Sequence, residues 1–439
     1  AGPIKVSEFV SGDTLKDVLN SGDAKRIHKA KKNLQSGFAA DALLGNWDVI
    51  GMDADNVLVD KKGQVWRIDN GGSMRMRAQG QPKGDAWNPY PTELWTMRGK
   101  EKQPGDPAVQ GANAQAAGVY GDMTYADVCK SVRELTNNRD AIIAATPVDT
   151  RDTMIARLDN LEHVAEAGEQ MTAHGWRDGY QDGFGRQVME TRKAGITDKL
   201  PAKLSTKKSG NQYDVSLKDE HGKAFDSLRG PKSIVADVKK RIEQAGGDYD
   251  IIKEWMSNQA SNSWRDEPQA FKWYIANELG LTDKCFWKDG KDYARDQYDN
   301  QVSIYGKEKY DRTVQMYHAF TYEFLSTADL PNKNSDGTFT LIRTESSKVV
   351  SKHKVGDTNI VGKRGALEST SLLNAISVSH SHVTVQRVPI SNILGTYLVE
   401  RYPGYNHGAF LGDSENEFVA VLGDQPFDYV ASTPYGYKY

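Results

Sequence analysis

The stretch SENEFVAVL places two glutamates, Glu415 and Glu417, at the start of an apolar segment with β propensity. Residues two apart in a strand point to the same face, so the two carboxylates would project side by side. Adjacent like charges are unfavourable unless a cation or a reaction uses them. The pair is therefore the first candidate site.

Two further polar segments precede this pair in the chain. Arg343 lies near the end of the strand-like segment FTLIRTE, and the Ser-Thr-Ser run 369–371 opens the segment STSLL. Taken singly, each has an ordinary interpretation: a surface arginine, a turn or helix cap, and a solvated strand edge. An arginine is also the side chain best suited to bidentate contact with phosphate oxygens.

In this order, the Arg strand, the Ser-Thr-Ser run and the Glu-x-Glu motif resemble the R-S-E class of mono-ADP-ribosyltransferases. The upstream segments QASNSWRDEPQAFKWYIANEL and YDRTVQMYHAFTYEFL resemble the helical subdomain of that family. The resemblance covers about residues 233–439. It implies an α+β ADP-ribosyltransferase fold, with a helical subdomain and a split β-sheet core. It also implies NAD+ as co-substrate, release of nicotinamide, and transfer of ADP-ribose to a target protein on arginine.

The resemblance assigns a role to each motif. Glu417 would hydrogen-bond a ribose hydroxyl and stabilise an oxocarbenium-like transition state, and Ser369 would hold Glu417 in place. Arg343 would pair with the NAD+ diphosphate, and Glu415 would face the acceptor arginine. Thr344 stands where many family members have glycine. The implied NAD+ contacts come from Arg343, Thr344, Ser369, Thr370, Ser371 and Glu417.

The segment before the Glu-x-Glu motif is ERYPGYNHGAFLGD. In the family this loop helps to choose the substrate, so Tyr405 and Phe410 are candidates for contact with the target. The alternative is that both aromatic side chains simply anchor the loop. Water could also serve as the acceptor, in which case the enzyme would be an NAD+ glycohydrolase.

A second constellation lies in LLGNWDVIGMDADNVLVDKKGQVWRIDNGGS, where Asp48 and Asn56 precede a hairpin and Asp69 follows it. It resembles the C-lobe of atypical kinases of the lipid-kinase or HipA type. There one Asp acts near the acceptor, and an Asp before Gly binds Mg²⁺ with ATP. In this chain Val49 and Ile50 replace the Arg-His pair common in the lipid-kinase version, and the Asp48–Asn56 spacing is longer than in ordinary kinases.

No Gly-rich loop and no strand lysine precede KVSEFVSGDTL, which resembles the hinge between kinase lobes. Because phosphoryl transfer depends on positioning the phosphates, we expect this block to be inactive or accessory in the present form. A missing N-terminal fragment could supply what is absent.

The chain divides by composition into three parts. Residues 1–195 read as a mainly helical, kinase-like block. Residues 196–232 are Lys-rich and punctuated by Gly and Pro, which indicates a linker that could hold a small hairpin. Residues 233–439 read as helices followed by strands, the order of an α+β domain.

Local signals within the first block are specific. The runs NVLVD and QVWRID flank a Lys-Gly tip, which predicts a β-hairpin. Thr124 and Asp127 have the spacing of a capping box. Residues 76–120 are rich in Gly, Pro, Gln and Ala and read as loops. A helical stripe is formed by Ile155, Leu158, Leu161 and Val164.

Composition excludes several classes of function. The chain has 439 residues and a net charge of −3, so no basic field indicates nucleic acid. No run approaches the roughly 18 apolar residues of a membrane span, and no signal peptide is visible. Cys129 and Cys285 read as reduced thiols. His380 and His382 are the only close histidine pair, and without a second cluster we expect no metal site there.

Three hypotheses for the whole protein follow. The first is a transferase that acts as an effector or toxin in the cytoplasm of a bacterial or host cell, delivered by a phage virion or by secretion. Its partners would be the target protein and possible virion proteins. The second is a kinase-like phosphotransferase that needs a missing N-lobe. The third is a structural virion or effector protein with a vestigial site.

Overall fold

The structure is a computed structural model that describes residues 10–101, 110–195, 206–207, 227–228, 239–240, 242–252, 266–286, 288–327, 330, 333–345, 347–361, 367–371, 382–396, 417–423 and 425–432. The chain forms two compact units, Ala1–Glu169 (unit 1) and Gln170–Tyr439 (unit 2). Each unit is described by itself.

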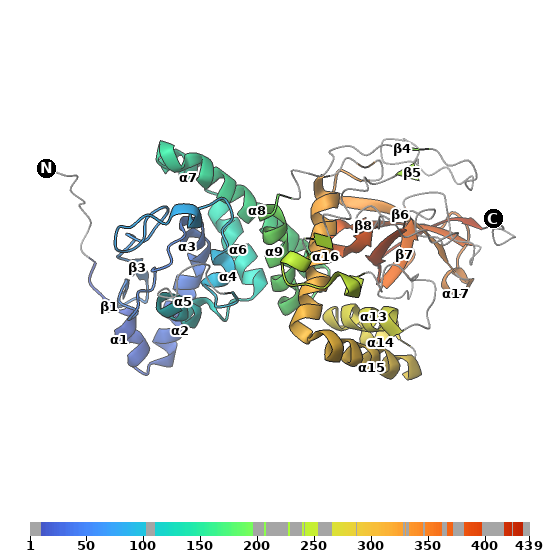
Figure 1. The fold of residues 1–439 in the computed structure, drawn as a ribbon, viewed down its shortest axis with the longest axis horizontal. Helices are drawn as coiled ribbons and strands as arrows, with labels where there is room; N and C mark the ends of the chain where they lie inside the picture. The colour runs from blue at the N-terminus through green and yellow to red at the C-terminus, as the bar shows by residue number, and fades with distance from the viewer. Residues whose placement is uncertain are drawn as a thin grey trace. The chain divides into compact units, whose positions relative to one another are not determined.

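Unit 1 is mainly helical, with a small antiparallel sheet of order β1-β2-β3 (Figure 1). The strands are β1 (Asp13–Thr14), β2 (Val57–Val59) and β3 (Val65–Arg67). The helices are α1 (Leu15–Asn20), α2 (Ala24–Ser36), α3 (Phe38–Leu44), α4 (Glu93–Thr96), α5 (Gln110–Tyr120), α6 (Tyr125–Thr136), α7 (Arg139–Ala145) and α8 (Arg151–Ala173), the last of which continues into unit 2.

The local predictions for unit 1 can be checked directly. The predicted hairpin is β2–β3, and Gly63 adopts a left-handed φ of 79° in its turn. The capping box is present: Thr124 accepts from the Asp127 amide, and Asp127 accepts from the Thr124 amide. Both predictions are confirmed. The prediction that residues 76–120 form loops is wrong in part, because the helices α4 and α5 lie within this region.

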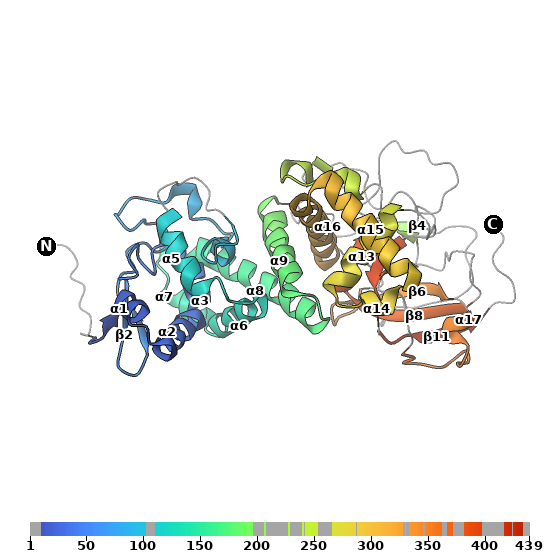
Figure 2. The ribbon, with the colours of Figure 1, turned by 90° about the horizontal axis from the view of Figure 1, so that it is seen from below.

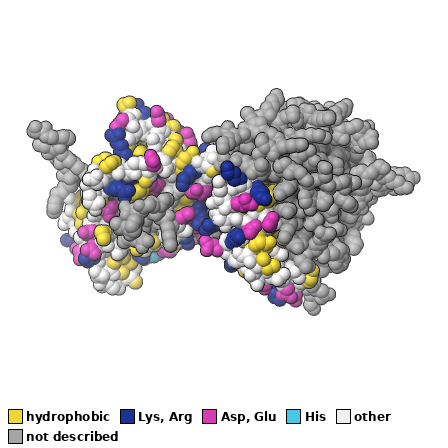
Figure 3. Space-filling view, in the orientation of Figure 1, with side chains coloured by type: hydrophobic (Ala, Val, Ile, Leu, Met, Phe, Trp, Pro, Cys, Tyr) yellow, Lys and Arg dark blue, Asp and Glu magenta, His cyan; other side chains and the backbone are white. Residues whose placement is uncertain are grey.

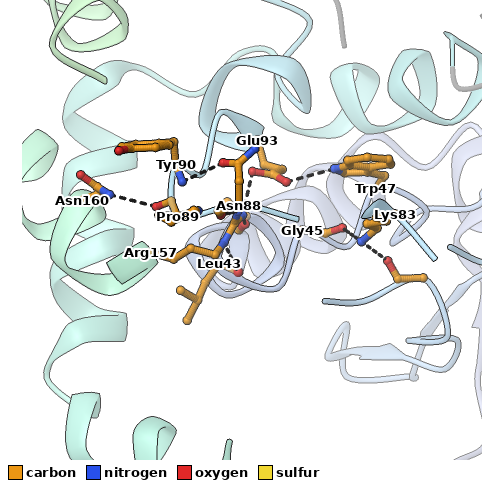
Figure 4. Close-up of polar contacts among 12 residues, drawn as sticks. Leu43, Gly45, Trp47, Lys83, Asn88, Pro89, Tyr90, Glu93, Arg157 and Asn160 are labelled. Atoms are coloured by element: carbon orange, nitrogen blue, oxygen red, sulfur yellow. Dashed lines mark hydrogen bonds and ion pairs between the residues drawn. The ribbon is translucent and has the colours of Figure 1, made fainter. Parts of the chain in front are cut away.

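The core of unit 1 contains a buried ion pair between Arg157 of α8 and Glu93 of α4 (Figure 4). The Arg157 guanidinium is fully buried, and its Nη2 lies 2.7 Å from Glu93 Oε2. Arg157 also donates to the carbonyls of Ala42, Leu43 and Asn88. A charge buried in this way is tolerated because it is both paired and hydrogen-bonded.

Unit 2 combines a helical layer with a six-stranded sheet whose neighbouring strands pair antiparallel (Figures 1 and 2). The sheet order is β11-β8-β6-β7-β10-β9. The strands are β6 (Thr338–Glu345), β7 (Leu367–Ser371), β8 (His382–Pro389), β9 (Ile393–Thr396), β10 (Glu417–Val421) and β11 (Asp428–Ser432). The helices are α9 (Asp178–Lys193), α13 (Asp266–Glu278), α14 (Thr282–Cys285), α15 (Lys288–Tyr305), α16 (Lys307–Thr327) and the short α17 (Ser347–Val350).

Helix α16 is the core of unit 2. Nearly all its side chains from Tyr310 to Leu325 are buried, because α9, α15 and β9 pack against it. The partnership with α9 changes the expected division of the chain. The sequence suggested a first block that ends at residue 195, whereas the compact units divide after Glu169 and α9 belongs to unit 2.

The long helices α9, α13, α15 and α16 all precede the strands of the six-stranded sheet, and the sheet is antiparallel, so the predicted α+β class is confirmed at this level. In the expected linker the structure describes only β4 (Thr206–Lys207) and β5 (Ser227–Leu228), which pair antiparallel.

Two surface properties bear on function. On the face drawn in Figure 3, acidic and basic side chains of the described part are interspersed and form no field of one sign. Across the described residues, none of the helices combines the length and apolarity needed to cross a bilayer.

Candidate functional site

The strands that carry the three predicted motifs are neighbours in the sheet of unit 2. Strand β7, with the Ser-Thr-Ser run, lies between β6, with Arg343, and β10, which begins at Glu417. Strands β8 and β9 come between β7 and β10 in the chain, yet they lie outside this trio. The fold therefore brings together segments that are distant in sequence.

The strand register aligns the motifs closely. The Cα of Ser371 lies opposite Ile342 of β6 on one side and opposite Glu417 of β10 on the other. These three positions form one row across the sheet. For Ser369, Thr370, Ser371, Thr344 and Glu417 the structure describes the backbone placement only.

Arg343 lies one position beyond this row. Its register partner is Thr384 of β8, whose Oγ1 donates to the Arg343 carbonyl at 3.3 Å. Because the pleat alternates along a strand, Ile342 and Arg343 project from opposite faces of β6. The structure therefore does not place the Arg343 side chain on the face of β6 that carries the Ile342 side chain.

The described partner of the Arg343 guanidinium is a residue that sequence reasoning missed. Its Nε donates to Oε1 of Glu345 at 3.1 Å, and the Glu345 residue is 3% exposed. The two residues share a face of β6 because they are two apart. That spacing within FTLIRTE was the signal available in the sequence. An anionic ligand at Arg343 would have to compete with this carboxylate.

The remaining residues predicted for this site lie outside the described residues. They are Glu415, Tyr405 and Phe410, and His380 of the histidine pair also lies outside the described residues. His382 is described: its Nδ1 lies 2.7 Å from the Tyr429 hydroxyl. Within the described ranges, no group of three or more His, Cys, Asp or Glu side chains could hold a metal ion. Cys129 and Cys285 are both free of disulfides.

Unit 1 holds the second site, which we call the acidic site: Asp48, Asn56 and Asp69. Asn56 precedes β2 and donates from Nδ2 to the Asp48 carbonyl at 2.7 Å. Asp69 follows β3, and its Oδ1 accepts from the Gly71 amide at 2.9 Å. The structure thus brings together the three residues that the kinase resemblance singled out.

The electrostatics of the acidic site show that its carboxylates interact. Burial raises the pKa of Asp48, the charge of Asp69 raises it further, a hydrogen bond from Asn56 opposes the shift, and Asp55 adds a smaller increase. A carboxylate whose pKa is raised by burial and by a neighbouring negative charge is stabilised by a cation. Two carboxylates and an amide are oxygen donors of the kind that Mg²⁺ takes.

A further oxygen supports this interpretation. Asn46 is 1% exposed, and its Oδ1 has no hydrogen-bond partner, while its Nδ2 donates to Asn70 Oδ1 at 3.3 Å. An added Cβ at Gly72 would lie 3.5 Å from both Asn46 Oδ1 and Asp48 Cβ, which places this oxygen beside the acidic site. A buried acceptor without a donor calls for a ligand or a water. The donor set therefore fits a hard divalent cation.

Comparison with protein-family models, with curated proteins and with solved structures finds no match to this chain.

Proposed function

We propose that the protein is an NAD+-dependent mono-ADP-ribosyltransferase that modifies a target protein on arginine and releases nicotinamide. The observation that carries the proposal is the adjacency of β6, β7 and β10, with Ser371 aligned between Ile342 and Glu417. The specific ADP-ribosyltransferase fold of the region 233–439 is part of the same proposal.

The chemistry assigns one task to each motif. Cleavage of the bond between nicotinamide and ribose develops positive charge on the sugar, as in glycoside hydrolysis. Glu417 stabilises that charge, and the Ser-Thr-Ser strand beside it orients the carboxylate. Arg343 binds the diphosphate through a planar, permanently charged guanidinium. Glu415 orients the acceptor guanidinium and takes its proton as it attacks.

The first experiment incubates the full chain with labelled NAD+ and a bacterial or host-cell lysate. We expect labelled protein bands with the wild type and none with Glu417→Ala. The matched control is Glu308→Ala on α16, because its side chain is 87% exposed and pairs only across one helix turn with Arg312. Equal labelling by wild type and Glu417→Ala would refute the assignment.

A second pair of variants tests Arg343. Arg343→Lys keeps the charge but loses the planar fork, so it should weaken NAD+ binding in calorimetry. Arg387→Lys on β8 is the control, because Arg387 forms a half-exposed ion pair with Asp336. An unchanged NAD+ affinity for Arg343→Lys would remove Arg343 from the site.

Glu415→Gln tests the division of labour between the two glutamates. It should suppress arginine modification and spare release of nicotinamide to water. A parallel loss of both activities would contradict the separate roles.

A second candidate function is supported by the acidic site of unit 1. The convergence of Asp48, Asn56 and Asp69 favours a Mg²⁺-dependent phosphotransferase. The Mg²⁺ would be held by Asp69 and Asn56, while Asp48 accepts a proton from the acceptor. Phosphate transfer from ATP in a longer chain should be lost in Asp69→Ala, and transfer that survives would exclude Asp69 as the metal ligand.

A further inference from the structure

Lys83 is a buried lysine that neither proposed function uses. The residue is 5% exposed and lies in the loop between β3 and α4. Its Nζ donates to the carbonyl of Gly45 at 2.5 Å and to the carbonyl of Gly72 at 2.8 Å (Figure 4). The ammonium also lies 4.8 Å from the centre of the Trp47 ring. The charged group is thus enclosed by two carbonyls and an aromatic face.

The two carbonyls belong to the two segments that carry the acidic site. Gly45 ends α3 in a left-handed conformation, with φ 57°, three residues before Asp48. Gly72 comes three residues after Asp69. A single ammonium therefore ties the segment of Asp48 to the segment of Asp69 without touching either carboxylate.

A charge-assisted bridge of this kind fixes the separation of the two segments. Hydrogen bonds from a charged donor are stronger than neutral ones, and they strengthen where water is excluded. The Met74 amide adds a second tie, because it donates to the Leu44 carbonyl at 2.6 Å. The position of Asn46 Oδ1 beside Gly72 depends on the same two segments.

We propose that Lys83 is the positioning residue of the acidic site: by bridging Gly45 and Gly72 it sets the distance between the Asp48 and Asp69 carboxylates, and so the affinity of the site for a divalent cation. The inference rests on the second candidate function in one respect, namely that the acidic site binds a cation.

The charges around Lys83 make the bridge sensitive to pH. Burial lowers the pKa of Lys83 to about 8, the carboxylate of Glu93 opposes that shift, and the charges of Arg157 and Arg77 lower the pKa further. Loss of the proton removes the charge from the bridge, so the bridge weakens as the pH rises through about 8.

The experiment is calorimetric titration of the full chain with Mg²⁺ at about pH 7 and about pH 9, on either side of the Lys83 transition. Lys83→Met keeps the length of the side chain and removes the bridge. We expect it to weaken Mg²⁺ binding by about 10- to 100-fold, as for other residues that orient metal ligands. Lys62→Met, at the exposed tip of the β2–β3 hairpin, should bind like the wild type.

The direction of the change separates positioning from simple electrostatics. Removal of a nearby positive charge would by itself tighten Mg²⁺ binding, whereas loss of positioning weakens it. The wild type should also lose affinity from about pH 7 to about pH 9, and Lys83→Met should not.

Each of the other outcomes would overturn a specific part of the proposal. Unchanged or tighter Mg²⁺ binding by Lys83→Met, with a lower melting temperature, would make Lys83 a purely structural residue and overturn the inference alone. Asp69→Asn identifies the site, because it should abolish the binding that Lys83→Met weakens. Absence of Mg²⁺ binding by the wild type would overturn both the inference and the phosphotransferase candidate.

Discussion

Replacement of Arg157 by methionine should strongly destabilise unit 1. The guanidinium is 0% exposed and Glu93 is 3% exposed, so the pair is wholly removed from water. Arg157→Met keeps most of the apolar stem but leaves the Glu93 carboxylate buried without its charge partner. It also takes a donor from each of three carbonyls, those of Ala42, Leu43 and Asn88.

The magnitude follows from the loss of the direct ion-pair partner of the buried Glu93 carboxylate. Removal of one partner of a buried ion pair costs about 3–5 kcal/mol. Part of the loss is recovered, because Glu93 still accepts a hydrogen bond of 3.1 Å from Trp47 Nε1. The stacking of Arg157 over Trp87, with 4.4 Å from Cζ to the ring centre, is lost as well. We therefore expect the free energy of unfolding of unit 1 to fall by about 3–5 kcal/mol.

The assay is hydrogen exchange followed by mass spectrometry in increasing urea, which reports the opening free energy of α3 and α8 separately from unit 2. The control is Arg133→Met. Arg133 makes a bidentate pair with Glu169, but both side chains are more than two-fifths exposed, so the loss should be at most about 1 kcal/mol.

A loss below about 1 kcal/mol for Arg157→Met would refute the reasoning, because it would mean that the buried carboxylate finds water or a proton at little cost. The double variant Glu93→Gln/Arg157→Met sharpens the test. It removes both charges, so it should be more stable than Arg157→Met alone.

Three further predictions concern stability. Burial lowers the pKa of His318 to about 3, so between about pH 3 and 6.5 the unfolded chain binds a proton that the folded chain does not. The free energy of unfolding should therefore fall by up to about 1.4 kcal/mol per pH unit as the pH drops through that window. His318→Phe should flatten this slope in urea titrations. Thr124→Ala removes the cap of α6 and should cost about 1 kcal/mol in hydrogen exchange of that helix, whereas Thr153→Ala, at a half-buried position within α8 that caps no helix, should cost less. Gly168→Ala should lower the melting temperature, because its new Cβ would lie 2.5 Å from Cε1 of the buried Tyr125 ring, and Gly179→Ala, with open space around it, should not.

The features that could be predicted from the sequence are those set by neighbours in the chain. The β2–β3 hairpin follows from β-branched runs around a Lys-Gly turn, and the α6 cap follows from the spacing of Thr124 and Asp127. In the stripe predicted on α8, Leu158, Leu161 and Val164 are buried, whereas Ile155 is only half-buried. Adjacent Met154 and Arg157 extend the buried face.

The features that could not be predicted depend on contacts between distant segments. Nothing near Lys83 in the sequence indicates that its ammonium meets the carbonyls of Gly45 and Gly72. The unpartnered Oδ1 of Asn46 points to a ligand site only because Gly72, which is distant in the sequence, lies beside it in the fold. The division of the chain after Glu169 likewise depends on the packing of α9 against α16.

The order of strands in unit 2 supports the proposed function more strongly than any single motif does. Many strand orders are possible for a six-stranded sheet. In this sheet β8 and β9 lie outside the trio, so that β6, β7 and β10 are neighbours. A protein without a site on these strands has no need of that order beyond the stability of the sheet. A vestigial transferase would keep the order for stability alone, because backbone pairing is indifferent to the chemistry at position 417. The strand order therefore does not distinguish a working transferase site from a vestigial one, and the Glu417→Ala experiment makes that distinction. Arg343 is the predicted site residue that would have to move most, because it lies one position beyond the row that contains Ser371 and already forms an ion pair with Glu345. Under the proposed function, NAD+ binding must break the ion pair with Glu345 and redirect the Arg343 guanidinium towards the diphosphate.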